Sequence, residues 1–225
     1  MLFWGDCMGR CVVAGGTGLV GQALLRGLSE SGRWEKIYDL GRRKALDDSR
    51  IETQITDWSE KEIRLPAVDT AFCCLGTTIK KAGSREQFRK VDLEYPLRFA
   101  SAAQKAGARK FLIVTALGAD QSSRIFYNQI KGEVELELQK LNFEALVLFH
   151  PSLLLGQRSE PRLGEELATH CFKLVGPLFR GPLLEVCPIP AKTVAASMVN
   201  WAQRPIRGIQ VVNNRMMLEE AAALR

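Results

Sequence analysis

The chain has 225 residues, of which 46% are hydrophobic and 25% charged, and this composition is typical of a soluble globular protein. No apolar run approaches the ~18–20 residues of a membrane-spanning helix, and no secretory signal is evident, so we expect a cytoplasmic protein without membrane contact. The net charge of +6 comes from basic residues scattered among acidic ones, which argues against a nucleic-acid partner.

Short apolar segments alternate with amphipathic segments along most of the chain. Strands are expected at residues 10–15, 36–41, 51–56, 69–76, 110–117, 145–150 and, shortest, 209–212. Helices are expected at 20–32, about 85–106, about 123–141 and near the C-terminal end. Strand–helix alternation without hairpin signals predicts an α/β fold with a doubly wound parallel sheet in the order 3-2-1-4-5-6.

The length suits one α/β core and is short for two, so one domain is expected to cover residues 1–225. The stretch after residue 150 is expected to form a small C-terminal cap on it. Residues 1–7 precede the first strand, and we expect them to be a non-essential extension. The six cysteines show no C-x-x-C spacing and only two histidines are present, so free thiols and no metal site are expected.

The segment GGTGLVG, residues 15–21, follows the first strand and opens the first helix. Here a doubly wound sheet binds the pyrophosphate of a dinucleotide, through free N–H groups and the helix dipole. Gly15 permits the turn, Gly18 removes a Cβ from the phosphates' approach, and Gly21 lets the helix pack closely on the sheet. The residues expected to bind are Gly15, Thr17, Gly18, Leu19, Val20 and Gly21. A glycine-rich turn without a ligand is the alternative.

The second strand ends in LGRRK, which bears on the choice of cofactor. About twenty residues after the glycines, NAD-binding proteins place Asp or Glu on the ribose 2′-hydroxyl. This chain has Gly41, Arg42 and Arg43 there, and two guanidiniums suit a 2′-phosphate. Asp39 lies within the strand, where its side chain need not reach the ribose. The sequence therefore favours NADP(H), with a solvated basic loop as the alternative.

Two more segments at the carboxyl ends of strands are expected to contact the cofactor. Asp57 and Trp58 follow the third strand and are expected to flank the adenine, although Asp57 suits a helix N-cap equally well. The segment CLGTT closes the fourth strand, where Gly76 lets the cofactor ribose lie against the backbone. The binding residues expected in that segment are Leu75, Gly76, Thr77 and Thr78.

Tyr127 and Lys131 stand four residues apart on an expected helix, and therefore on one face of it. Tyr127 is the only one of the three tyrosines with lysine at this spacing. An ammonium beside a phenol favours its deprotonation, so the phenol can exchange a proton with a carbonyl/alcohol pair. An exposed helix pair is the alternative.

Together these motifs resemble the short-chain dehydrogenase/reductase superfamily, over nearly the whole chain. More narrowly, they resemble its atypical, NADP-binding branch, which includes Tat-interacting oxidoreductase-like proteins. The matching stretches are GGTGLVG, LGRRK, FCCLGTT, KAG, GAD-SS, YNQIKGEVE and FHPSLLLG. The resemblance implies a Rossmann fold, Tyr127 as catalytic acid or base, and Lys131 at the nicotinamide ribose. It also places the segment from Pro151 to Gly156, with Leu153, beside the nicotinamide.

The resemblance further implies a hydroxyl at the end of the fifth strand that polarises the substrate carbonyl. Relatives usually carry serines there, whereas this chain has Thr115 and Ala116. Thr115 is the expected donor if it lies in register, and Ala116 in that place would remove the donor. Asp92 stands where many relatives have asparagine, and His150 stands where arginine is usual.

The predicted function is that of an NADP(H)-dependent oxidoreductase acting on a small carbonyl or alcohol substrate. One alternative is an NADPH-binding sensor or interaction protein without turnover. A nucleotide-sugar epimerase or dehydratase ranks lower, because such enzymes usually need a larger C-terminal lobe. The sequence leaves room for a protein partner or a homodimer.

Overall fold

Seven parallel strands form the central sheet of the computed structural model, which describes residues 9–58, 62–156 and 181–223. Their order is β3-β2-β1-β4-β5-β6-β9. The strands are β1 (Arg10–Ala14), β2 (Lys36–Gly41), β3 (Ile51–Ile55), β4 (Thr70–Cys73), β5 (Lys110–Val114), β6 (Ala145–His150) and β9 (Gly208–Asn213). The doubly wound parallel sheet is confirmed, with its first six strands in the predicted order.

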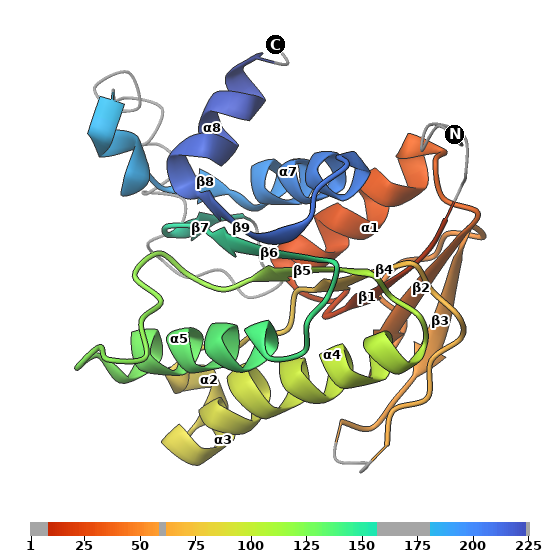
Figure 1. Cartoon of the computed structure of the whole chain (residues 1–225), viewed down its shortest axis with the longest axis horizontal. Helices are drawn as coiled ribbons and strands as arrows, with labels where there is room; N and C mark the ends of the chain where they lie inside the picture. The colour runs from red at the N-terminus through yellow and green to blue at the C-terminus, as the bar shows by residue number, and fades with distance from the viewer. Residues whose placement is uncertain (1–8, 59–61, 157–180, 224–225) are drawn as a thin grey trace.

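Helices cover both faces of this sheet (Figure 1). One face carries α1 (Leu19–Ser31), α7 (Ala191–Gln203) and α8 (Asn214–Ala223), and the other carries α4 (Tyr95–Lys105) and α5 (Phe126–Gln139). Two short helices, α2 (Ile79–Ala82) and α3 (Arg85–Arg89), precede α4. Because both faces are covered, β1, β4, β5 and β6 are buried along nearly their whole length, which explains their continuous apolar sequences.

The helix expected at about 85–106 is interrupted in the structure. It consists of α3, a π-helical turn (Lys90–Glu94) and α4, which has Pro96 in its first turn. Proline has no N–H to donate to the preceding turn, so a regular α-helix cannot run through this point unchanged. Such π-helical turns are rare and often occur at functional sites. This turn carries Asp92.

The region after residue 150 differs from the predicted cap. The short strand expected at 209–212 is β9, which extends the main sheet by pairing with β6 in parallel. The helix α7, which the sequence analysis did not identify, packs on α1 and makes the crossover between β6 and β9. A small separate sheet pairs β7 (Leu154–Leu155) with β8 (Ile189–Pro190), next to a 3-10 helix (Gly181–Glu185). One domain over residues 1–225 stays a prediction, since the structure describes only part of that range.

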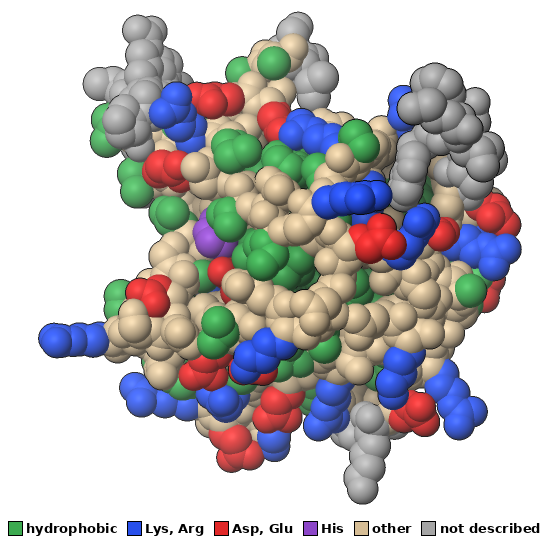
Figure 2. Space-filling model, viewed as in Figure 1, with side chains coloured by type: hydrophobic (Ala, Val, Ile, Leu, Met, Phe, Trp, Pro, Cys, Tyr) green, Lys and Arg blue, Asp and Glu red, His purple; other side chains and the backbone are tan. Residues whose placement is uncertain are grey.

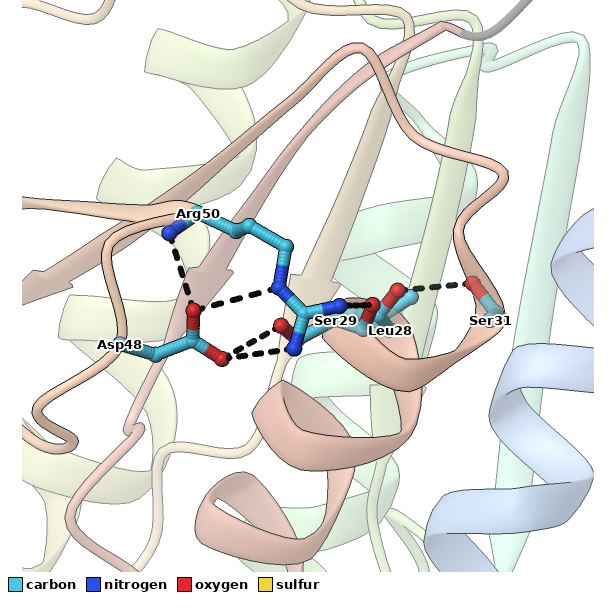
Figure 3. A network of polar contacts seen from close by, with 5 residues as sticks. All are labelled: Leu28, Ser29, Ser31, Asp48 and Arg50. Carbon is cyan, nitrogen blue, oxygen red and sulfur yellow. Dashed lines mark hydrogen bonds and ion pairs between the residues drawn. The ribbon is translucent and has the colours of Figure 1, made fainter.

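Asp48 ties the start of β3 to the end of α1 (Figure 3). Its carboxylate accepts a hydrogen bond from the Ser29 hydroxyl at 2.5 Å and another from the Arg50 amide at 2.9 Å. The Arg50 guanidinium donates to the Ser29 carbonyl at 2.6 Å. The Ser29 hydroxyl, followed by the Arg50 amide and guanidinium, lowers the pKa of Asp48 from 3.8 to about 2. They fix one end of the connection from β2 to β3, which begins with Arg42 and Arg43.

The cysteines and the surface charges of the described residues match two of the predictions. Cys11, Cys73, Cys74 and Cys187 are free, while Cys7 and Cys171 lie outside the described residues. Lysine and arginine side chains are interspersed with acidic ones over the face in Figure 2. In the ranges that the structure describes, no helix is long and apolar enough to cross a membrane.

Candidate functional site

The glycine loop joins β1 to α1 at the carboxyl edge of the sheet. Gly15 has a φ of 88°, which side chains disfavour, and a Cβ there would collide with the backbone of Cys74. A Cβ at Gly21 would collide with the carbonyl oxygen of Gly15. Gly21 therefore lets α1 approach the loop, and only a chain with glycine at both positions can make this turn.

The first turn of α1 is suited to bind an anion. Its N-cap, Gly18, supplies no side-chain acceptor, so the helix lacks the usual capping hydrogen bond at its N-terminus. Gly18 and Thr17 are exposed, whereas the side chain of Val20 belongs to the core. Val20 and the half-buried Leu19 can therefore offer backbone N–H groups to a phosphate, which the helix dipole also attracts.

Arg42 and Arg43 lie in the exposed turn after β2. Neither forms an ion pair with a carboxylate in the described part of the chain, unlike Lys44, whose ammonium lies 2.6 Å from Asp47. Two unpaired guanidiniums close to the glycine loop create a local positive potential. This arrangement fits the predicted recognition of a 2′-phosphate.

Lys131 connects Tyr127 to a buried carboxylate. Its ammonium lies 5.9 Å from the centre of the Tyr127 ring and 2.8 Å from Asp92 Oδ1, and the side chains of Lys131 and Asp92 are 6% and 0% exposed. The Tyr127 ring also packs on Phe88, with ring centres 5.6 Å apart. Thr77 donates its amide hydrogen to Asp92 Oδ2 at 2.9 Å. The π-helical turn thus brings Asp92 to the helix that carries Tyr127.

The ion pair keeps Lys131 protonated. Burial disfavours the ammonium, but the charge of Asp92 and the nearby phenol of Tyr127 outweigh burial and raise the pKa of Lys131. The pKa of Asp92 is raised as well, because burial opposes its charge more strongly than Lys131 and the Thr77 amide favour it. The 2.8 Å contact is that of an ammonium and a carboxylate, and we assign these charges at neutral pH.

The loop after β4 borders this pair, as its predicted cofactor role requires. A Cβ at the exposed Gly76 would lie 3.4 Å from Asp92 Oδ1 and 3.7 Å from Lys131 Nζ, so only bare backbone covers the pair there. Leu75 and Thr77 are half-buried in the same loop. The Thr78 hydroxyl caps α2 by accepting a hydrogen bond from the Lys81 amide at 3.2 Å, so that side chain already has a structural role.

Thr115 does not present its hydroxyl as expected. The side chain is buried, and its oxygen lies 2.5 Å from Glu135 Oε1 and 3.3 Å from the Phe149 carbonyl oxygen. His150 Nε2 lies 2.8 Å from the same Glu135 oxygen. A buried hydroxyl that donates its one proton to Glu135 is not available to polarise a substrate carbonyl. The expected register is therefore not supported, because Thr115 points toward α5.

Trp58 also departs from its expected role. Its ring is only 5% exposed and stacks on Tyr95, with ring centres 5.9 Å apart, so it packs into the core and does not flank a ligand. Asp57 is exposed beside it. Near the end of β6, Pro151 is buried and accepts a hydrogen bond from the Leu117 amide at 2.9 Å, whereas Leu153 is largely exposed. Pro151 thus ties the β6 loop to the segment that leads to α5.

Neither Asp92 nor Glu135 has a role that the sequence predicts. Glu135 follows Lys131 by four residues and therefore lies on the same face of α5, a spacing that could have indicated its inward position. Asp92 stood out as a departure from its relatives, but no local pattern places it next to Lys131. Both positions depend on how α4 and α5 pack.

A glycine loop at the carboxyl edge of a parallel sheet, together with a Tyr–Lys pair on α5, defines a Rossmann-fold protein of the NAD(P)-binding class. The sequence pattern of the NAD dependent epimerase/dehydratase family matches residues 11–123. The chain belongs to this family.

Similarity to individual proteins extends over most of the chain. It is 32% identical to protein HTATIP2 of Rattus norvegicus over 214 residues, covering 92% of this chain and 86% of the relative. It is 38% identical to a protein of Eremothecium gossypii named FMP52, mitochondrial, covering 74% of this chain and 76% of the relative. The solved structure of MoeE5 in complex with UDP-glucose and NAD shares the fold, with a TM-score of 0.68 and 14% identity over 96% of this chain and 82% of MoeE5.

One expectation has to be corrected. Several relatives, including those of Eremothecium gossypii, Debaryomyces hansenii and Candida albicans, are named as mitochondrial proteins. These names contradict the expected cytoplasmic location. The absence of an evident targeting pattern in the sequence was a weak basis for that expectation.

Proposed function

We propose that the chain is an NADP(H)-dependent oxidoreductase that interconverts a small carbonyl compound and its alcohol. The observation that carries this proposal is the buried Lys131–Asp92 pair beside Tyr127. It fixes a protonated lysine next to a half-buried phenol, at the sheet edge where the glycine loop also lies. A merely exposed helix pair would not bury the lysine.

The residues present fit a phosphorylated dinucleotide. The bare turn from Gly15 to Gly18 and the first turn of α1 would hold the pyrophosphate, and Arg42 and Arg43 would hold the 2′-phosphate. Gly76 has no side chain between the Lys131 ammonium and the place proposed for the cofactor ribose, since a Cβ there would lie 3.7 Å from Nζ. When bound, NADPH supplies the hydride for reduction of a carbonyl carbon.

Tyr127 supplies the proton in this scheme. Its hydroxyl donates a hydrogen bond to the substrate oxygen and transfers its proton as the carbonyl becomes an alcohol, and the phenolate then regains a proton from solvent. Lys131 stabilises the phenolate by its charge, and Asp92 keeps the ammonium in place. Because the Thr115 proton is directed to Glu135, we assign the polarisation of the substrate oxygen to Tyr127 and not to Thr115.

Binding without turnover is the second candidate function. It is favoured by one observation, the engagement of the Thr115 hydroxyl by Glu135, which leaves the site without the second donor that the resemblance implies. This candidate shares the cofactor-binding residues with the first. NADPH oxidation that depends on a carbonyl substrate separates the two.

The test is a screen of small aldehydes and ketones for NADPH oxidation, and UDP-glucose, which MoeE5 binds, is assayed in the opposite direction for reduction of NADP⁺. With any substrate found, Tyr127→Phe is expected to lower the rate about 10²–10⁴-fold while NADPH affinity stays close to that of the parent. Tyr38→Phe, a change of a half-buried tyrosine on β2, is the matched control and should keep the parental rate. Parental turnover in Tyr127→Phe would refute the proposed role of the phenol.

A further inference from the structure

Asp39 is a buried carboxylate in β2, and its side chain is fixed between the two loops proposed to hold the cofactor phosphates. The residue is 1% exposed, and no cation pairs with it within the described ranges. Burial raises the pKa of Asp39, although the Ala45 amide and the hydroxyl of Thr53, its neighbour on β3, oppose that change. A carboxylate in such a place is costly to bury.

The contacts of Asp39 show what its role is. Its Oδ2 accepts a hydrogen bond from the Ala45 amide at 3.0 Å. Its Oδ1 lies beside Gly16, where a Cβ would collide with it and would come within 3.0 Å of the Ala45 Cβ. The carboxylate therefore joins the glycine loop to the turn of residues 42–45. We call this turn the arginine turn, since it contains Arg42 and Arg43.

We infer that Asp39 is a positioning residue that orders the arginine turn against the glycine loop and thereby sets the preference for a cofactor with a 2′-phosphate. This inference rests on the proposed cofactor. Arg42, Arg43 and Lys44 are exposed in the arginine turn, and Lys44 pairs with Asp47 on the surface, whereas Ala45 is half-buried and packs against the core. Without the Asp39 hydrogen bond, both guanidiniums would have to be ordered when the ligand binds, at a cost in conformational entropy.

Only recognition of the 2′-phosphate should depend on this order. NAD(H) has no phosphate at that position, so its affinity rests on the glycine loop and on α1. The negative charge of Asp39 has the opposite tendency, because a fixed carboxylate repels a phosphate. Ordering of the arginine turn outweighs this repulsion.

The test compares Asp39→Leu, Asp39→Asn and the control Asp47→Ala, which removes an exposed carboxylate from the same connection. Calorimetry gives the dissociation constants of NADP⁺ and NAD⁺, and amide hydrogen exchange without any cofactor reports the order of residues 42–47. Asp39→Leu should speed amide hydrogen exchange at Ala45 and raise the dissociation constant of NADP⁺ about tenfold. The dissociation constant of NAD⁺ should change by less than about twofold. Asp39→Asn retains an acceptor oxygen for the Ala45 amide and should behave like the parent, as should Asp47→Ala.

Two results with Asp39→Leu would overturn the inference. In one, the ratio of the two dissociation constants stays that of the parent; in the other, NADP⁺ binds more tightly because repulsion dominates. A folded Asp39→Asn variant that exchanges at Ala45 as fast as Asp39→Leu would also contradict it. If the parent chain binds both dinucleotides equally, the proposed cofactor preference itself is refuted. If the parent prefers NADP⁺ and Asp39→Leu keeps the same ratio of dissociation constants, this inference alone is refuted.

Discussion

Removing the Asp92 carboxylate tests directly whether Lys131 is held in a buried ion pair. In Asp92→Ala the ammonium keeps its burial but loses the oxygen 2.8 Å away, and the Thr77 amide loses its acceptor. Breaking one side of a buried pair costs about 3–5 kcal/mol of unfolding free energy. For a chain of this size, such a loss corresponds to a fall in Tm of roughly 6–20 °C.

Two further variants separate charge from packing. Asp92→Asn retains an acceptor for Thr77 and is expected to cost less, about 1–2 kcal/mol. The double variant Asp92→Leu/Lys131→Met removes both charges and should be more stable than Asp92→Ala, because neither buried charge is left unpaired. The assay is denaturant unfolding at pH 7. A loss below about 1 kcal/mol in Asp92→Ala, the range of exposed pairs, would refute the reasoning.

The pH dependence of the unfolding free energy gives an independent check on the Lys131–Asp92 pair. The folded pKa of Lys131 is raised above its ordinary value of 10.5, so the stability it contributes is complete below pH 10.5 and is lost as the pH rises through the higher folded value. In Asp92→Ala the opposing carboxylate is gone, so burial lowers the pKa of Lys131 and the variant loses this buried charge at a lower pH than the parent does. The difference in unfolding free energy between the parent and Asp92→Ala should therefore be largest near pH 7 and should narrow as the pH rises toward 10.5.

Three other predictions follow from the site and its supports. The double variant Arg42→Ala/Arg43→Ala should lose about 1–3 kcal/mol of NADP⁺ binding energy in calorimetry while its NAD⁺ affinity is retained. Equal losses for both dinucleotides would contradict the assignment of these arginines to the 2′-phosphate. Thr115→Val should keep turnover within about threefold of the parent, because its hydroxyl faces Glu135, and a loss as large as that of Tyr127→Phe would restore Thr115 to the site. The low pKa of Asp48, about 2 against 3.8, stabilises the folded state above pH 3.8 and ceases to do so as the pH falls through 2. The stability advantage of the parent over Asp48→Asn should therefore shrink between pH 4 and pH 2, and an advantage unchanged at pH 2 would argue against the network in Figure 3.

The strands and the glycine loop were predictable because their signals are local. Six strands stand at or within a few residues of their expected places, since a parallel sheet covered on both faces requires continuous apolar runs. The helix α7 was missed because its apolar residues follow a stretch without regular alternation. The strand β9 was identified, but its place in the main sheet depends on α7 packing on α1.

The site was less predictable, because side-chain direction depends on packing between elements. The Tyr127–Lys131 spacing follows from helix geometry alone, but the partner of Lys131 comes from a π-helical turn on another element. Thr115 was expected to face a substrate, and the strand register instead directs it to α5. Trp58 was expected at the adenine, and the aromatic residues of α4 bury it.

The central claim is that the chain transfers hydride from NADPH to a carbonyl compound with Tyr127 as the proton donor. The most direct measurement is mass spectrometry of the alcohol formed in a single turnover with NADPH deuterated at the transferred position of C4. We expect one deuterium on the carbinol carbon with the parent chain and about 10²–10⁴-fold slower labelling with Tyr127→Phe. A parent chain that binds NADPH but labels no carbonyl compound in the screen would contradict the claim and would favour binding without turnover.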